Sequence, residues 1–282
     1  MRVRKSIVAA VPFVVAACAA YVMVSAASAQ LPLEPARERG NSITGAFEGW
    51  YKNDDGTFTL LMGYYNRNTR QTLEIPVGPN NRIEPGGPDL GQPTVFEPRR
   101  GWGVFSIVVP KDFGTKKYTW TITANGETTT VPLSLHSQWE ISPFKDPAMG
   151  NTPPTIKFSP AGNVLTGPPR GIATTYNGAV NQPVAMEFWV ADKGNTEGGG
   201  GGFGRGGATV SVSMHKFRGP GEIKWARDRP EVSKEDGKVS ASGTFSAPGD
   251  YTVRVQVNDS SGEGGGGFQC CWTNAHVKVT IK

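Results

Sequence analysis

Apolar and polar residues alternate along much of this chain with a period of two. The clearest case begins at Tyr251, where Tyr251, Val253, Val255 and Val257 alternate with Thr252, Arg254, Gln256 and Asn258. Val277, Val279 and Ile281 repeat the pattern near the C-terminal end. Successive side chains of a strand point to opposite faces of a sheet, so this period predicts β-strands that bury one face.

Turn signals separate several of these segments. Asn125-Gly126 lies between the alternating residues 118–123 and 127–131, and Asp55-Gly56 lies between 49–51 and 58–62. Asn-Gly and Asp-Gly steps favour the tight turns of β-hairpins. We therefore expect two hairpins here, with the strand that begins at Phe58 continuing through Tyr65.

The remaining segments of strand length extend this pattern over the whole chain. In the first half we expect strands at 72–77 and 104–109, with residues 84–103 as a long irregular connection. In the second half we expect strands at 155–158, 172–174, 184–190, 208–214, 238–245, 251–258 and 275–282, with a charged connection at 218–238.

Strand lengths and frequent turns together predict an all-β fold of two Ig-like antiparallel β-sandwich domains. The 37 glycines and 22 prolines fit all-β modules with long loops. We expect an N-terminal sandwich at 46–136, a connector at 137–152 and a C-terminal sandwich at 153–282.

A family resemblance supports the second sandwich. Phe245-Ser246-Ala247-Pro248-Gly249-Asp250-Tyr251-Thr252-Val253, followed by Asp259-Ser260-Ser261-Gly262, resembles the PKD-type and related Ig-like repeats of exported bacterial proteins. Its Gly-x-Tyr step resembles the tyrosine corner of Ig-like sandwiches. The resemblance implies a spacer, adhesion or carbohydrate-associated module, and it brings no catalytic residues with it.

The N-terminus has the pattern of a secretory signal. Arg2, Arg4 and Lys5 precede an apolar run, and Ala27-Ser28-Ala29 forms a small-residue cleavage site. We expect residues 1–29 to be removed, residues 30–45 to be a flexible lead-in, and the protein to be secreted, periplasmic or on the cell surface. Val15-Ala16-Ala17-Cys18 also resembles a lipoprotein box, so a lipid anchor at Cys18 is a second possibility.

Cleavage removes three basic residues, which leaves 26 Lys and Arg against 24 Asp and Glu. A chain so close to neutral, without a clustered basic face, gives no reason to expect a nucleic-acid partner. The mature chain has no apolar run long enough for a membrane span.

Two similar glycine runs suggest a location for function. Glu197, five glycines and Phe203 form the first, and Glu263, four glycines and Phe268 form the second. In an Ig-like order these are the B–C and F–G loops, which lie at the same end of the sandwich. We expect a binding tip there for a glycan or another exported protein, or else simple solvated connectors. The candidate binding residues are Phe203, Arg205, Phe268, Trp272 and Asn274.

Cys270 and Cys271 are the only cysteines that remain after export. An oxidising compartment favours a vicinal disulfide, which is a stiff tight turn. The alternatives are free or intermolecular thiols, or a redox or copper site with His276, in which Met214 and His215 could also serve as ligands. Alternation places His276 on the solvent face with Lys278, which weakens the copper reading. No cofactor is expected.

Two other groups of residues are candidate sites, and each also has a simpler structural explanation. Trp50, Tyr51, Tyr64, Tyr65 and Trp102 could stack on sugar rings, but aromatics at strand spacing more often build a core. Asp259 and Glu263 lack the ordered ligand pattern of a calcium loop.

No nucleophile-elbow, zinc-protease or Walker motif occurs in the chain, although paired carboxylates of a glycan-active enzyme stay open. The sequence thus predicts an exported non-catalytic binding or adhesion/structural module. A small redox or copper-handling protein centred on Cys270 and Cys271 is the alternative.

Overall fold

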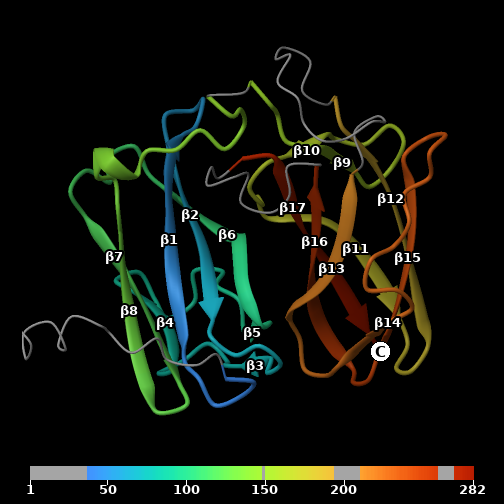
Figure 1. Ribbon diagram of the computed structural model, residues 1–282, viewed down its shortest axis with the longest axis horizontal. Coiled ribbons are helices and arrows are strands. Elements are labelled where there is room, and N and C mark those ends of the chain that lie inside the picture. The colour runs from blue at the N-terminus through green and yellow to red at the C-terminus, as the bar shows by residue number, and fades with distance from the viewer. Residues whose placement is uncertain (1–36, 148–149, 194–209, 260–269) are drawn as a thin grey trace, which may run out of the picture. The chain divides into compact units, whose positions relative to one another are not determined.

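The computed structural model describes residues 37–147, 150–193, 210–259 and 270–282, and its regular structure is almost entirely β (Figure 1). The helical element in these residues is one short 3-10 turn, η1 (Ser137–Trp139). Within the same residues, no helix has the length and apolar character needed to cross a membrane. The all-β prediction is confirmed.

Eight strands build the first sandwich. Its two main sheets have the orders β1-β2-β6 and β4-β7-β8, and β3 and β5 form a short ribbon. The strands are β1 (Ile43–Lys52), β2 (Phe58–Asn66), β3 (Leu73–Glu74), β4 (Asn81–Glu84), β5 (Val95–Phe96), β6 (Arg99–Val109), β7 (Lys117–Ala124) and β8 (Glu127–Ser134).

Both predicted hairpins are present, since β1 pairs with β2 and β7 with β8, with Ala124 opposite Glu127 across the Asn-Gly turn. Three boundaries differ from the sequence prediction. The first strand begins at Ile43, inside the expected lead-in, because this side chain is fully buried in the core. The strand expected at 72–77 is only two residues long, and β5 and the start of β6 occupy part of the connection expected at 84–103.

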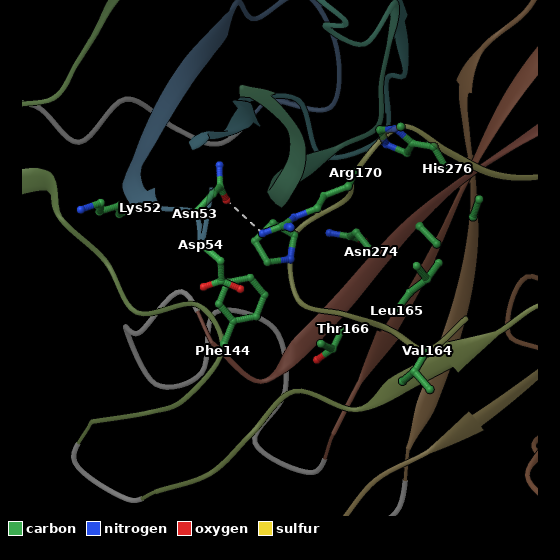
Figure 2. Close-up of a pocket in the computed structure, with 14 residues that line it drawn as sticks. Lys52, Asn53, Asp54, Phe144, Val164, Leu165, Thr166, Arg170, Asn274 and His276 are labelled. Atoms are coloured by element: carbon green, nitrogen blue, oxygen red, sulfur yellow. Dashed lines mark hydrogen bonds between the residues drawn. The ribbon is translucent and has the colours of Figure 1, made fainter. Parts of the chain in front are cut away.

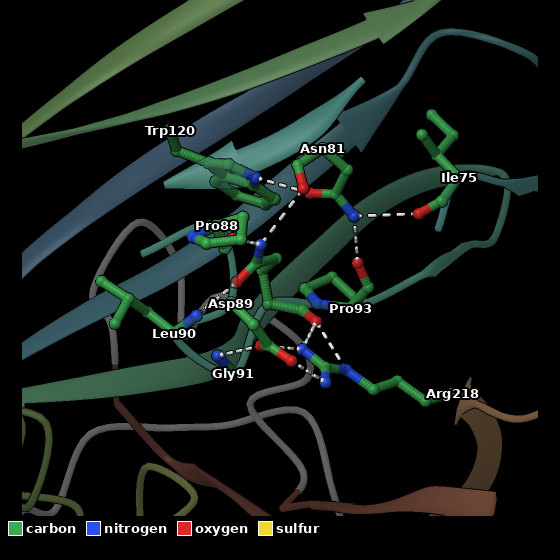
Figure 3. Close-up of polar contacts among 10 residues, drawn as sticks. Ile75, Asn81, Pro88, Asp89, Leu90, Gly91, Pro93, Trp120 and Arg218 are labelled. Carbon is green, nitrogen blue, oxygen red and sulfur yellow. Dashed lines mark hydrogen bonds and ion pairs between the residues drawn. The ribbon is translucent and has the colours of Figure 1, made fainter. Parts of the chain in front are cut away.

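A buried polar side chain organises that connection. Asn81 accepts a hydrogen bond from the indole of Trp120 at 3.0 Å and donates to the carbonyls of Ile75 and Pro93 (Figure 3). Gln92 donates to the carbonyl of Asn81 and so continues the network. Buried backbone carbonyls need partners, and these amides supply them where no strand ladder does.

Nine strands build the second sandwich, in sheets of order β10-β9-β12-β15-β14 and β11-β17-β16-β13. They are β9 (Thr155–Lys157), β10 (Leu165–Thr166), β11 (Ile172–Gly178), β12 (Pro183–Ala191), β13 (Ser211–Arg218), β14 (Ile223–Trp225), β15 (Lys238–Phe245), β16 (Gly249–Asn258) and β17 (Trp272–Ile281).

This order follows the Ig-like plan. Strands β9, β12, β15 and β14 correspond to A, B, E and D, while β13, β16 and β17 correspond to C, F and G. The predicted assignment of B, C, F and G is therefore correct. One pair departs from an all-antiparallel arrangement, because β11 runs parallel to β17.

The predicted tyrosine corner is also present. The hydroxyl of Tyr251, itself buried, donates to the carbonyl of Ala247 at 2.9 Å. Tyr251 packs edge-on against Phe245 in the core between the two sheets. This hydrogen bond fixes the entry of β16, the strand that carries the clearest alternation in the sequence.

Each sandwich has its own hydrophobic cluster, although Phe217 of β13 belongs to that of the first. By their contacts, residues 37–282 group into one compact unit. The domain boundaries at 136 and 153 stay a prediction.

We expect Tyr251→Phe to lower the free energy of unfolding by about 1–2 kcal/mol, because the carbonyl of Ala247 loses its buried donor. Chemical denaturation of the purified chain measures this change. The matched control is Tyr65→Phe, at a side chain that is 47% exposed, which should change stability by less than about 0.5 kcal/mol. Equal effects of the two substitutions would contradict the role of the corner.

Candidate functional site

The outer face of strands β16 and β17 is polar but buried. Arg254, Gln256, Asn258, Asn274 and His276 are each less than 10% exposed. The predicted alternation is correct, since Val277, Val279 and Ile281 face the core. The prediction that His276 faces solvent is wrong, because the first sandwich covers this face.

Strand β6 (Figure 1) supplies hydrogen-bond partners for this face. The side-chain amide of Asn274 donates to the carbonyl oxygens of Gly103 at 2.9 Å and Trp102 at 3.2 Å. His276 Nε2 lies 3.0 Å from the carbonyl oxygen of Val104. A run of three consecutive carbonyls thus accepts hydrogen bonds from two alternate residues of β17.

A buried carboxylate lies behind these carbonyls. Glu48 Oε1 is 3.0 Å from Arg100 Nη2, and both carboxylate oxygens lie 3.0 Å from the backbone nitrogen of Gly103. Burial raises the pKa of Glu48 to about 7, although Arg100 and the Gly103 N–H lower it in part. Arg254 of the second sandwich also acts on Glu48.

His276 is held in its neutral form. Burial lowers its pKa to about 4, and the nearby charges of Arg254 and Arg218 lower it further, against the hydrogen bond to Val104. Nε2 carries the proton because it faces a carbonyl oxygen, so Nδ1 is an acceptor. Its ring also packs 4.3 Å from that of Phe217.

Ion pairs also connect strand β13 to the first sandwich. Lys216 pairs with Glu74 at 2.5 Å, and Arg218 pairs with Asp89 at 2.8 Å. Arg218 Nε also donates to the carbonyl of Gln92 at 2.8 Å, within the connection that Asn81 organises (Figure 3). The polar network of the first sandwich therefore presents the groups that bind β13.

Trp272 and Asn274 lie in this buried contact rather than at an exposed tip. Trp272 is 1% exposed, and its ring lies so close to the backbone at Gly103 that a side chain there would overlap it. Gly103 also has φ +51, a conformation that favours glycine. Both residues contact the first sandwich, and Asn274 also lines a cavity beside this contact. Their role in binding a ligand stays a prediction.

The other predicted binding residues, Phe203, Arg205 and Phe268, lie outside the described residues. The strand ends from which the two glycine runs start are described. Ser211 pairs with Asn258, and Asn258 pairs with Trp272. Three of the four attachment points are thus in one row at one end of the sheet.

Cys270 and Cys271 lie at this end and are joined as a vicinal disulfide. Their Cα atoms are 3.7 Å apart, both residues are buried, and Cys271 has φ +82. The sulfur of Cys270 contacts the carbonyl of Asn151, and the carbonyl of Cys271 accepts from the backbone N–H of Asp259 at 3.3 Å. The cysteine pair therefore contacts both the end of β16 and the segment after residue 150.

Further hydrogen bonds hold the ends of β16 and β17 in place. The side-chain amide of Asn151 donates to Asp259, and the hydroxyl of Thr273 donates to the carbonyl of Pro154 and accepts from the backbone N–H of Gly167. All three side chains are buried. The glycine runs thus begin from a firmly packed support.

The five aromatic residues considered as a stacking platform do not form one. Tyr51 and Tyr64 are buried in the fold, Trp50 donates to the carbonyl of His136 at 2.8 Å, and the ring of Trp102 lies under Arg100. Tyr65 alone among them is exposed. The interpretation of these side chains as mainly structural is the better one.

The geometry gives the copper alternative no support. Both nitrogens of His215 have partners, Glu97 at 2.6 Å and Ser213 at 2.9 Å, and Met214 is in the core. His276 and the two cysteines are engaged as described above. Across the described ranges, no group of three or more His, Cys, Asp or Glu side chains is placed to hold a metal ion.

We expect Glu48 and His276 to have opposite effects on the pH dependence of stability. The pKa of Glu48 rises from 4.5 to about 7. Its contribution to the free energy of unfolding is therefore fully present below pH 4.5 and is lost as pH rises through 7. The pKa of His276 falls from 6.5 to about 4, so its contribution is present above pH 6.5 and is lost as pH falls through 4.

Urea unfolding at several pH values between these limits tests this expectation. In Glu48→Gln the free energy of unfolding should increase with pH, and in His276→Gln it should decrease with pH. Either slope should be at most about 1.4 kcal/mol per pH unit. The exposed Glu222 provides the control, because Glu222→Gln should keep the wild-type profile. Slopes of the same sign in both variants would contradict the assignment.

The disulfide predicts a simple mass change. Reduction of the unfolded chain without residues 1–29 should add about 2 Da, and a thiol-alkylating reagent should label it only after reduction. Cys271→Ser should abolish the mass change. Labelling of two thiols in the unreduced wild-type chain would show that the pair is not bonded.

No protein-family model matches this chain, and neither does any curated protein sequence. Among solved structures, it is similar to domains 4 and 5 of the S-layer protein SbsC, with 10% identity, 86% of this chain and 98% of that chain covered, and a TM-score of 0.23. It is similar to the D0-D1 domain of intimin, with 12% identity, 85% and 98% covered, and a TM-score of 0.24. It is also similar to the D00-D0 domain of intimin, with 12% identity, 85% of this chain and 100% of that chain covered, and a TM-score of 0.25. At these TM-scores the similarity supports no argument about this chain.

Proposed function

We propose that this protein is an exported, non-catalytic binding or adhesion module that acts at the cell surface or in the periplasm. It binds a glycan or another exported protein through the glycine-run end of its second sandwich. The single observation that carries the proposal is the row formed by Ser211, Asn258 and Trp272, where both glycine runs meet the sheet.

The packing below that row suits such a role. Asn151, Thr273 and the Cys270–Cys271 pair fix the strand ends through buried hydrogen bonds and a covalent link. Binding loops work best on a rigid scaffold, because the scaffold limits the freedom that a partner must remove on binding. The disulfide and the predicted secretory signal both favour an oxidising, exported location.

The proposal predicts that the two phenylalanines of the glycine runs contact the partner. Phe203→Ser combined with Phe268→Ser should weaken binding at least about tenfold, as expected when aromatic contacts are lost from an interface. Binding is measured on a glycan array and on immobilised envelope fractions with the labelled exported chain.

Tyr65→Ser is the matched control, because it removes an exposed aromatic ring from the first sandwich. It should leave binding unchanged. Undiminished binding by the double variant would overturn the role of the glycine runs. Failure of the wild-type chain to bind either surface would overturn the proposed function.

A further inference from the structure

A cavity of about 470 Å³ opens beside the contact between the two sandwiches (Figure 2). The turn between β1 and β2, the connector at Phe144, the segment 164–173 and strand β17 line it. Its volume is within the range of about 300–1,000 Å³ that small-molecule sites occupy. It is lined by both charged and apolar side chains.

Arg170 is held in position at this cavity. Its Nη2 donates to Asn53 Oδ1 at 3.1 Å, and its guanidinium lies 5.9 Å from the ring centre of Tyr51 and 5.8 Å from that of Phe144. The side chain has no other hydrogen bond or ion pair in the described part of the chain. Most of its five N–H donors are therefore available to a ligand.

Two further charged side chains line the opening, Lys52 and Asp54. Both are exposed, and neither has an ion pair or side-chain hydrogen bond with the residues that the structure describes. With Arg170, they give the cavity two cations and one carboxylate. This balance favours an anionic ligand that also carries hydroxyl groups, because Asp54 accepts hydrogen bonds.

Apolar surface accompanies these charges. The ring of Phe144 is 36% exposed and stands edge-on to Tyr51 at 5.2 Å, so its orientation is fixed. Val164, 53% exposed, and Leu165 extend this surface on the facing segment. His276, which also lines the cavity, is kept neutral and therefore adds no third cation.

We propose that this cavity binds a sugar that carries a carboxylate, such as a hexuronic-acid unit of an anionic polysaccharide. Arg170 pairs with the carboxylate, for which a planar guanidinium is well matched, and Lys52 adds to the attraction. Phe144 packs against the apolar C–H face of the sugar ring, and Asp54 accepts from its hydroxyls. The inference rests on the proposed binding function and names a second site and a ligand class for it.

Calorimetric titration of the exported chain with a trimer of galacturonic acid tests the proposal. We expect binding at least tenfold tighter than with the neutral galactose trimer, and an affinity that falls as salt is added. Arg170→Gln should weaken binding at least tenfold, and Lys52→Gln should weaken it less. Arg229→Gln, at an exposed arginine outside the cavity lining, is the matched control and should bind as the wild type does.

Two results would overturn the inference. One is absence of uronate binding by the wild-type chain, and the other is equal affinity of the wild type and Arg170→Gln when both have the same thermal midpoint. A triglutamate peptide that binds as tightly as the uronate would overturn the ligand class. If the glycine-run variants still lose envelope binding in any of these cases, the proposed function stands and only this second site is wrong.

Discussion

The structure depends on the burial of polar groups on the outer face of β16 and β17. Removing an amide or a charge from water is unfavourable unless hydrogen bonds replace the lost hydration. Within the face, Arg254 donates to Gln256 at 2.8 Å, and Gln256 donates to Asn258 at 3.3 Å. Asn274 and His276 donate outside their own sheet, to the carbonyls of β6. Directional hydrogen bonds therefore help to fix how the two sandwiches meet.

Charge balance follows from the same requirement. Arg254 is buried, and its charge acts on the carboxylates of Glu48 and Glu97 in the first sandwich. His276, in the same row, stays neutral and adds no further positive charge. Loss of one member of such a set costs more than a lost contact, since it leaves its partner buried and unpaired. This explains why residues 37–282 group into one unit although they hold two hydrophobic cores.

Much of this fold could be predicted from the sequence, because period two and turn residues are local signals. They located both hairpins, seven of the nine strands of the second sandwich and the tyrosine corner. They missed β10, and β14 lies in the connection expected at 218–238. They also identified which residues share a face with His276, but not what covers that face, since a pattern within one strand carries no information about distant segments. The pairing of β3 with β5 was missed for a related reason: the side chain of Asn81 bonds the carbonyls of Ile75 and Pro93, which flank these two short strands. Trp272 is a large apolar side chain among the outward-facing residues of β17. It was the local signal that this face is covered.

The contact between Trp272 and Gly103 has a consequence for the order in which the molecule can be completed. Strand β17 comes after every other strand in the chain, yet it fills the space over Gly103 and satisfies the carbonyls on either side. During synthesis, the first sandwich therefore emerges well before the segment that covers its β6 edge. Until then the carbonyls of β6 lack the donors that Asn274 and His276 supply. The vicinal cysteines directly precede that segment, so oxidation and final closure concern the same few residues.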